Sequence, residues 1–247
     1  MPFRNANIGS LHIRHSVGVG WGQIEAKNSQ IAYSCNMAKQ PVRRKPEQER
    51  SVKSMNRMIE AGEQLFYEGG SSALTLNAVL DRAGTSTGSF YARFGDMRGF
   101  TNAMHEHVLE LVSAELIKAY AKASKQPDLE SAVQAICIES FKIVSKHRFS
   151  LYFFAVGNLQ DPQGRAIGKE FRFSMSDMFI EIMKSYLPKN SSLARKQRLD
   201  FAARMGVSAL YQQIMFDQKE MSLLTVKEKN SAIALADMIC LYVRATK

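Results

Sequence analysis

The chain has 247 residues and a mass of 27.7 kDa, which is enough for one large helical domain or two unequal ones. Apolar residues make up 45% of the sequence, and an excess of 33 basic over 23 acidic side chains gives a formal net charge of +10, which favours partners such as nucleic acid or anionic surfaces. The three cysteines form no metal-site or disulfide spacing, and the longest apolar run, residues 151–156, is far too short to span a membrane. We therefore expect a soluble, cytoplasmic protein.

Residues 1–46 differ from the rest of the chain. The first 36 contain four glycines and show neither helical nor strand periodicity, so a disordered extension is expected there. A polar, basic stretch begins at Met37, which raises the hypothesis that translation starts at that residue. The extension ends in a basic arm that contains Arg43, Arg44 and Lys45.

From residue 47 onward the apolar residues recur at steps of three and four, which predicts helices almost throughout and an all-α fold. The sequence EGGSS at 68–72 is expected to end the first helix. Thr75 can cap a short second helix, and Gly84 suits the left-handed conformation that ends it.

A third helix of about two turns follows, with Ser86 or Thr87 as its cap. Phe90 and Phe94 lie four residues apart and are expected to face inward. The residues expected to face outward are Thr87, Ser89, Tyr91 and Arg93. Two short helices joined by a tight glycine-containing turn, behind a longer helix, predict a helix-turn-helix at residues 47–100, whose second helix fits the major groove of DNA.

Residues from about 50 to 104 resemble the DNA-binding domain of the TetR (tetracycline repressor) family, through the stretch MIEAGEQLFYEGGSSALTLNAVLDRAGTSTGSFYARFGDMRGFTNAM. The shared pattern is a helix, a threonine-capped helix, an Ala-Gly turn, a recognition helix with Gly88, Tyr91 and Phe94, and the start of the next helix. The resemblance implies a two-fold dimer on a palindromic operator, and a divergent C-terminal domain that binds a ligand.

The resemblance also implies roles for individual residues. Thr87 and Ser89 match recognition-helix positions, Tyr91 matches a phosphate contact, and Arg93 lies near bases or backbone. Met97 stands where many members carry a lysine, and the neighbouring Arg98 is turned by about 100° around the helix. The charge of the basic arm predicts that it lies along the phosphates or in the minor groove of the DNA. A solvated tail is the alternative interpretation. The predicted DNA-binding residues are Arg43, Arg44, Lys45, Thr75, Thr85, Ser86, Thr87, Gly88, Ser89, Tyr91, Arg93 and Arg98.

Residues 101–247 are predicted to form a helical ligand-binding and dimerisation domain. The expected helices cover about 96–124, 128–146, 148–159, 164–187, 192–217 and 225–245. Their aromatic and methionine side chains suit a cavity for a small apolar or aromatic effector, with plain core packing as the alternative for each one. The predicted ligand-binding residues are Met104, Phe141, Tyr152, Phe154, Phe171, Met175, Met178 and Phe179.

The last two helices carry stripes with small residues that would let a second chain approach, which predicts a four-helix interface in a homodimer. The predicted interface residues are Leu199, Ala203, Gly206, Leu210, Ile214, Ile233, Ala236 and Cys240.

Other motifs indicate no chemistry. The sequence HEH at 105–107 is expected to be solvated rather than metal-binding, because residues two apart point to different sides of a helix. His147, beside Arg148, is expected to serve carbonyls at a helix end. No cofactor, metal site or catalytic group is predicted. Three functions remain: a ligand-responsive transcription regulator, with repression expected; an architectural or weakly specific DNA binder without effector; and a helical enzyme or carrier.

Overall fold

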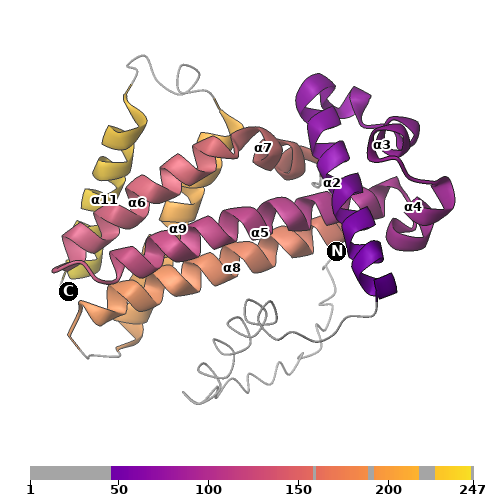
Figure 1. Cartoon of the computed structure of the whole chain (residues 1–247). Helices are drawn as coiled ribbons and strands as arrows, with labels where there is room; N and C mark the ends of the chain where they lie inside the picture. The colour runs from indigo at the N-terminus through magenta and orange to yellow at the C-terminus, as the bar shows by residue number, and fades with distance from the viewer. Residues whose placement is uncertain (1–45, 158–159, 189–191, 217–225, 246–247) are drawn as a thin grey trace, which may run out of the picture. The chain divides into compact units, whose positions relative to one another are not determined.

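The computed structural model describes residues 46–157, 160–188, 192–216 and 226–245, and the regular structure in these ranges is helical (Figure 1). The expected all-α fold is confirmed. The predicted arm residues Arg43, Arg44 and Lys45 lie outside the described residues, as does the rest of the extension up to residue 45. The helices are α2 (Pro46–Ala73), α3 (Leu76–Ala83), α4 (Thr87–Phe94), α5 (Met97–Ala123), α6 (Leu129–Lys146), α7 (Arg148–Gly157), α8 (Pro162–Ser185), α9 (Leu193–Met215) and α11 (Glu228–Arg244).

The helix ends follow the local signals in the sequence. Gly69 and Gly70 have non-helical backbone angles near the end of α2, and φ is 65° at Gly70. The Thr75 hydroxyl accepts a hydrogen bond from the Ala78 amide at 3.3 Å, which starts α3, and Gly84 ends α3 in the left-handed region with φ of 59°. These three expectations are confirmed.

Two further side-chain caps stabilise the turns before and after α4. Ser86, rather than Thr87, caps α4 by accepting from the Ser89 amide at 3.3 Å. Asp96 caps α5 through the Gly99 amide at 2.7 Å. A Cβ atom on Gly99 would lie only 1.9 Å from the Phe94 carbonyl oxygen, so the turn from α4 into α5 requires glycine at this position.

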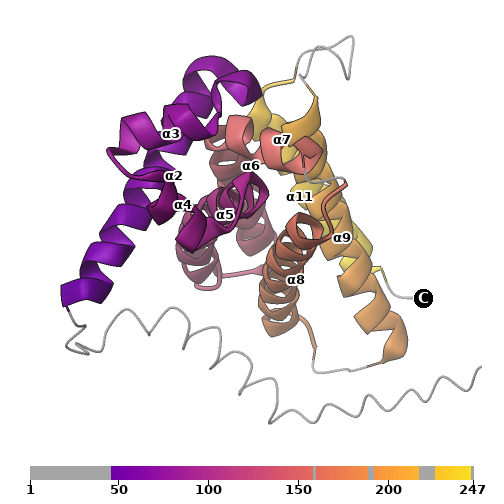
Figure 2. The ribbon, with the colours of Figure 1, turned by 90° about the vertical axis from the view of Figure 1, so that its right-hand side faces the viewer.

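Residues Ser51–Lys247 form one compact unit, in which α5 is the central element. α5 packs against α6 on one side and α8 on the other, while α11 packs on α6 and α9 (Figures 1 and 2). The predicted domain boundary at residue 100 falls inside α5. A single helix therefore runs from the core of the helix-turn-helix into the C-terminal bundle.

The helix-turn-helix has its own aromatic core. Phe90 of α4 and Phe100 of α5 are fully buried, with ring centroids 5.2 Å apart. Phe94 lies 5.0 Å from Phe100 and is half-buried, so both phenylalanines of α4 face inward as expected. This core fixes which side of α4 is left for solvent. None of the helices in the described ranges is long and apolar enough to cross a membrane.

Candidate DNA-binding surface and effector cavity

The outer side of α4 is a small polar surface. Thr87, Gly88 and Ala92 are exposed, and 48% of Tyr91 is exposed, while Ser89 is half-buried. None of the polar atoms on this surface is needed for the core, which is made by Phe90 and its aromatic neighbours. A surface of small side chains with one exposed tyrosine lets a backbone or base edge approach α4 closely.

Arg93 does not point outward, and that expectation is wrong. Its Nη1 atom donates to the Ser89 carbonyl oxygen at 2.8 Å and to the Ser89 hydroxyl, and its Nη2 atom lies 3.4 Å from the Ser51 hydroxyl of α2. The side chain is half-buried because its long stem folds back along α4 towards α2. Arg93 therefore braces α4 against α2 in this state.

The other predicted DNA-binding residues differ in how accessible they are. The hydroxyls of Thr75 and Ser86 are used as helix caps, and Thr85 is half-buried. Arg98 is exposed and lies near Asp161, whose carboxylate caps α8. A hydrogen bond from the buried Asn102 amide at 2.9 Å is the main reason that the pKa of Asp161 is below its usual range, and Arg98 adds to this.

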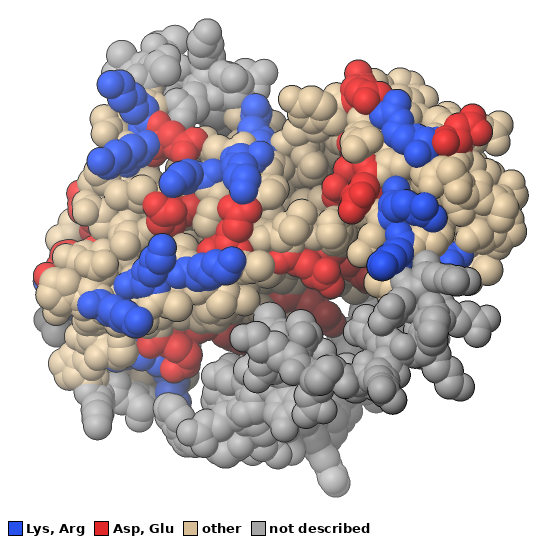
Figure 3. Space-filling view, in the orientation of Figure 1, with Lys and Arg blue, Asp and Glu red and all other residues tan. Residues whose placement is uncertain are grey.

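The helix-turn-helix carries little net charge. Residues 51–100 contain five basic and five acidic side chains, and Figure 3 shows both signs interspersed over this part of the molecule. Arg82 is paired with Glu68 at 2.7 Å. Lys53 and Arg57 are basic side chains exposed on α2, where they are available to phosphates. These two α2 residues are not among the predicted DNA-binding residues, although both lie on the polar side of the predicted helix.

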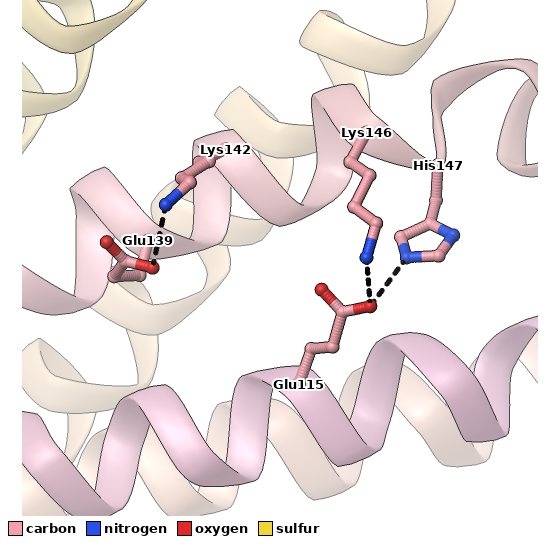
Figure 4. Close-up of polar contacts among 5 residues, drawn as sticks. All are labelled: Glu115, Glu139, Lys142, Lys146 and His147. Atoms are coloured by element: carbon pink, nitrogen blue, oxygen red, sulfur yellow. Dashed lines mark hydrogen bonds and ion pairs between the residues drawn. The ribbon is translucent and has the colours of Figure 1, made fainter.

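The expectation for His147 is wrong, whereas Arg148 has that role. His147 Nε2 lies 3.0 Å from Glu115 Oε1, and Lys146 Nζ lies 2.7 Å from the same oxygen (Figure 4). Hydrogen bonds from Lys146 and then His147 lower the pKa of Glu115, which joins α5 to the end of α6. Arg148 Nε donates to the carbonyl oxygens of Gln213 and Ile214 in the last turn of α9, at 3.1 and 3.2 Å.

A cavity of about 590 Å³ lies among α5, α6, α7, α8, α9 and α11. Five of the eight predicted ligand-binding residues line it: Phe141, Phe154, Phe171, Met175 and Phe179. Its volume and largely apolar wall suit an organic ligand of moderate size.

Three predicted ligand-binding residues lie elsewhere. Met104 is buried where α2 crosses α5, since a Cβ atom on Gly62 would lie 2.8 Å from its sulfur. Tyr152 is 45% exposed, because it lies two residues from Phe154 and so on another side of α7. Met178 is half-buried and packs against the core outside the cavity wall.

Polar side chains also line the cavity, and His105 is one of them, so the prediction that it is solvated is wrong. His105 is only 5% exposed and stacks on Phe154 with ring centroids 4.7 Å apart. Burial, and then the nearby Arg172 guanidinium, lower its pKa to about 4. The signal was its spacing from Leu109 and Val112, which puts His105 on the buried stripe of α5.

Further along α5, Tyr120 and Ser140 form a buried pair with their hydroxyl oxygens 3.4 Å apart. Burial raises the pKa of Tyr120 to about 12 and that of the neighbouring Cys137 thiol to about 12. Both groups are therefore neutral at physiological pH. The Tyr120 hydroxyl offers a hydrogen-bonding group in the cavity wall, and the Cys137 thiol offers an apolar one.

We expect His105 to make the protein less stable as the pH falls from 6.5 to about 4. In the unfolded chain His105 is protonated below about pH 6.5, whereas in the folded chain it is protonated only below about pH 4. The free energy of unfolding therefore decreases progressively between these pH values, by about 3 kcal/mol in total. His105→Phe keeps the stack on Phe154 and should flatten this slope. Urea titrations at several pH values measure it, and parallel curves for the two proteins would contradict the assignment.

The predicted dimer interface is mostly inside the chain. Leu199, Ala203, Gly206, Ala236 and Cys240 are buried in the chain's own core, so they do not form an accessible surface. A Cβ atom on Gly206 would lie 3.6 Å from the Phe179 ring and 3.9 Å from Ile239, so this small residue accommodates helices of its own chain. Leu210, Ile214 and Ile233 are half-buried.

The opposite sides of α9 and α11 carry large apolar side chains on the surface. Met238 is 68% exposed and Leu241 is 74% exposed. The rings of Phe201 and Tyr242 lie 5.5 Å apart, which joins the two helices into one apolar surface. We call it the α9/α11 face; its members are Phe201, Met205, Met238, Leu241 and Tyr242. An exposed apolar surface of this kind is typical of a protein interface.

Within the described ranges no group of three His, Cys, Asp or Glu side chains is arranged to hold a metal ion. The candidate functional features are the exposed side of α4, the cavity and the α9/α11 face.

Comparison with protein families matches residues 58–104 to the bacterial regulatory proteins of the tetR family. No curated protein matches the sequence. Among solved structures, GusR from Salmonella enterica has a TM-score of 0.56 and 13% identity, covering 78% of this chain and 96% of its own. The TetR family transcriptional regulator PfmR from Thermus thermophilus has a TM-score of 0.51 and 17% identity, covering 77% and 99% respectively.

These solved structures share the fold along most of their length, and the family match covers α3, α4 and the neighbouring parts of α2 and α5. Residues 58–104 therefore form a domain of the tetR family of bacterial regulatory proteins.

Proposed function

We propose that the chain is a cytoplasmic, ligand-responsive repressor of transcription that binds a palindromic operator as a homodimer and is released by a small apolar or aromatic effector. It acts by binding rather than by catalysis. The observation that carries the proposal is that α5 belongs both to the core beneath α4 and to the wall of the 590 Å³ cavity. A ligand in the cavity and DNA on α4 would therefore bias the same helix.

Dimerisation is supported by the α9/α11 face and by the size of α4. A recognition helix of eight residues offers few base contacts alone, so two copies are needed, separated by roughly 34 Å or a multiple of that distance. Two helices from each chain, packed across a two-fold axis through Met238 and Leu241, would form a four-helix interface.

A second connection supports coupling between the cavity and the helix-turn-helix. His105 stacks on Phe154, and the Phe154 ring lies 5.0 Å from Phe153. Phe153 in turn lies 4.0 Å from Phe66 of α2. A ligand that prefers one arrangement of these rings by about 100-fold shifts the equilibrium by about 2.7 kcal/mol, which suffices to weaken operator binding substantially.

The alternative function is an architectural or weakly specific DNA binder. Such a protein depends on phosphate attraction, whereas residues 51–100 carry balanced charges. An architectural DNA binder also does not require a cavity of about 590 Å³. Both observations favour the regulator.

Selection of binding sites from a random duplex library tests the proposal. We expect enrichment of an inverted repeat, bound at about 150 mM salt with a clear preference over scrambled DNA. Enrichment of sequences without symmetry, or binding that disappears at that salt concentration, would favour the alternative.

Gly88→Ala separates DNA binding from stability. Gly88 is exposed on α4, and a Cβ atom there would meet no atom within 4 Å, so alanine should raise helix stability by about 0.5–1 kcal/mol. If α4 lies in a DNA groove, the same methyl group should weaken operator binding about tenfold. Thermal unfolding and fluorescence anisotropy measure the two effects, and unchanged affinity would place Gly88 away from the DNA.

A further inference from the structure

The cavity is elongated along α5. Its wall includes residues of α5 from His105 to Tyr120, a distance of roughly 22 Å at the usual helical rise. Between these ends the α5 side of the wall is entirely apolar, with Leu109, Val112 and Leu116. A wall of this shape fits an extended apolar body better than a compact polar one.

The end of the cavity near His105 carries positive charge. Gly164 and Gly168 lie one turn apart on α8, and both are buried in the cavity wall. A Cβ atom on Gly168 would lie 3.1 Å from Arg172 Nη1 and 3.7 Å from His105 Cε1, so both side chains converge on the same point. Arg165 also lines this end.

The charged side chains in the cavity wall are basic. Among the described residues that line the cavity there are two arginines and no Asp or Glu. Arg165 and Arg172 are exposed, so an anion bound to them would keep part of its hydration and avoid the full cost of burial. Guanidinium groups also match the planar geometry of a carboxylate.

We propose that the effector is an amphipathic carboxylate, whose carboxylate binds Arg172 and Arg165 beside His105 and whose apolar body extends along α5 towards Tyr120. This inference rests on the proposed function only in taking the cavity as the effector site. His105 contributes a neutral imidazole, because its pKa of about 4 leaves it uncharged at physiological pH. A neutral imidazole can donate one N–H hydrogen bond to a carboxylate.

Matched pairs of probes test the inference on the purified full chain without DNA. Decanoate is compared with decan-1-ol, and 2-naphthoate with 2-naphthalenemethanol, by calorimetry at about pH 7.5. We expect at least one carboxylate to bind about tenfold or more tightly than its alcohol. Arg172→Gln should abolish that preference and leave alcohol binding unchanged. Lys169→Gln, which removes the same charge from an exposed position of α8 outside the wall, should retain it.

Three outcomes would overturn the inference: no carboxylate binds, the alcohols bind as tightly as the carboxylates, or Lys169→Gln and Arg172→Gln have equal effects. Because these measurements contain no DNA, their failure leaves operator binding intact. Conversely, a failure to select an inverted repeat would remove the proposed regulator but not the carboxylate site.

Discussion

Glutamates introduced together at Met238 and Leu241 are expected to convert the protein into a folded monomer that no longer holds its operator. Both side chains are largely exposed within one chain, so their replacement should leave the fold intact. Across a two-fold axis the four new carboxylates would repel one another and be desolvated. Operator affinity should fall on the order of a thousandfold, because each chain then binds one half-site alone.

Sedimentation velocity and fluorescence anisotropy measure these two effects. Phe173→Glu is the matched control, since Phe173 is 60% exposed on α8 and lies outside the α9/α11 face. It should remain a dimer with normal affinity. A double variant that stays dimeric, or that binds operator as a monomer with undiminished affinity, would show that the interface lies elsewhere.

Gly99→Ala is expected to abolish DNA binding through the turn that orients α4. The new Cβ atom would lie 1.9 Å from the Phe94 carbonyl oxygen, and backbone atoms cannot yield as a flexible side chain would. The Gly95–Asp96 turn must therefore shift, and α4 shifts with it relative to α5. We expect a loss of about 3 kcal/mol in the free energy of unfolding, at the upper end for overpacking.

Urea denaturation and anisotropy with operator DNA check this expectation. Gly88→Ala adds the same methyl group to open space nearby and should not destabilise the fold, which makes it the control for stability. If Gly99→Ala retains both stability and operator binding, the turn is more adaptable than the geometry implies, and the position of α4 does not depend on it.

The helix-turn-helix was predictable because its signals are local. A threonine cap at Thr75, a left-handed glycine at Gly84 and a glycine pair at Gly69 and Gly70 each act within a few residues, and each is found as expected. Apolar spacing likewise located the helices of the C-terminal bundle. Such signals need no knowledge of what packs against the helix.

The predictions for the dimer interface are wrong because the sequence does not show which helix packs against a given side of α9. In α9 the stripe with Ala203 and Gly206 is apolar because it packs on α8 and α11 of its own chain, while the exposed side with Phe201 also carries Arg204. Periodicity distinguishes sides by polarity and does not identify their partner. A helix that is apolar on two sides therefore remains ambiguous from sequence.

Side-chain length caused a different kind of error at Arg93. Its Cβ position on α4 was assigned correctly, but the long side chain folds back to Ser89 and Ser51. The sequence HEH suggests one solvated motif, although its first residue, His105, continues the buried stripe of α5. Tertiary contacts decide both cases, and local sequence patterns do not specify those contacts.

Hydroxyl-radical footprinting of the selected operator tests the central claim most directly. If two copies of α4 lie in successive major grooves, the protein should protect two patches on one side of the duplex, related by two-fold symmetry and separated by one helical turn or a whole number of turns. Tyr91→Ala should weaken both patches equally. A single protected patch, or uniform protection without symmetry, would contradict the account.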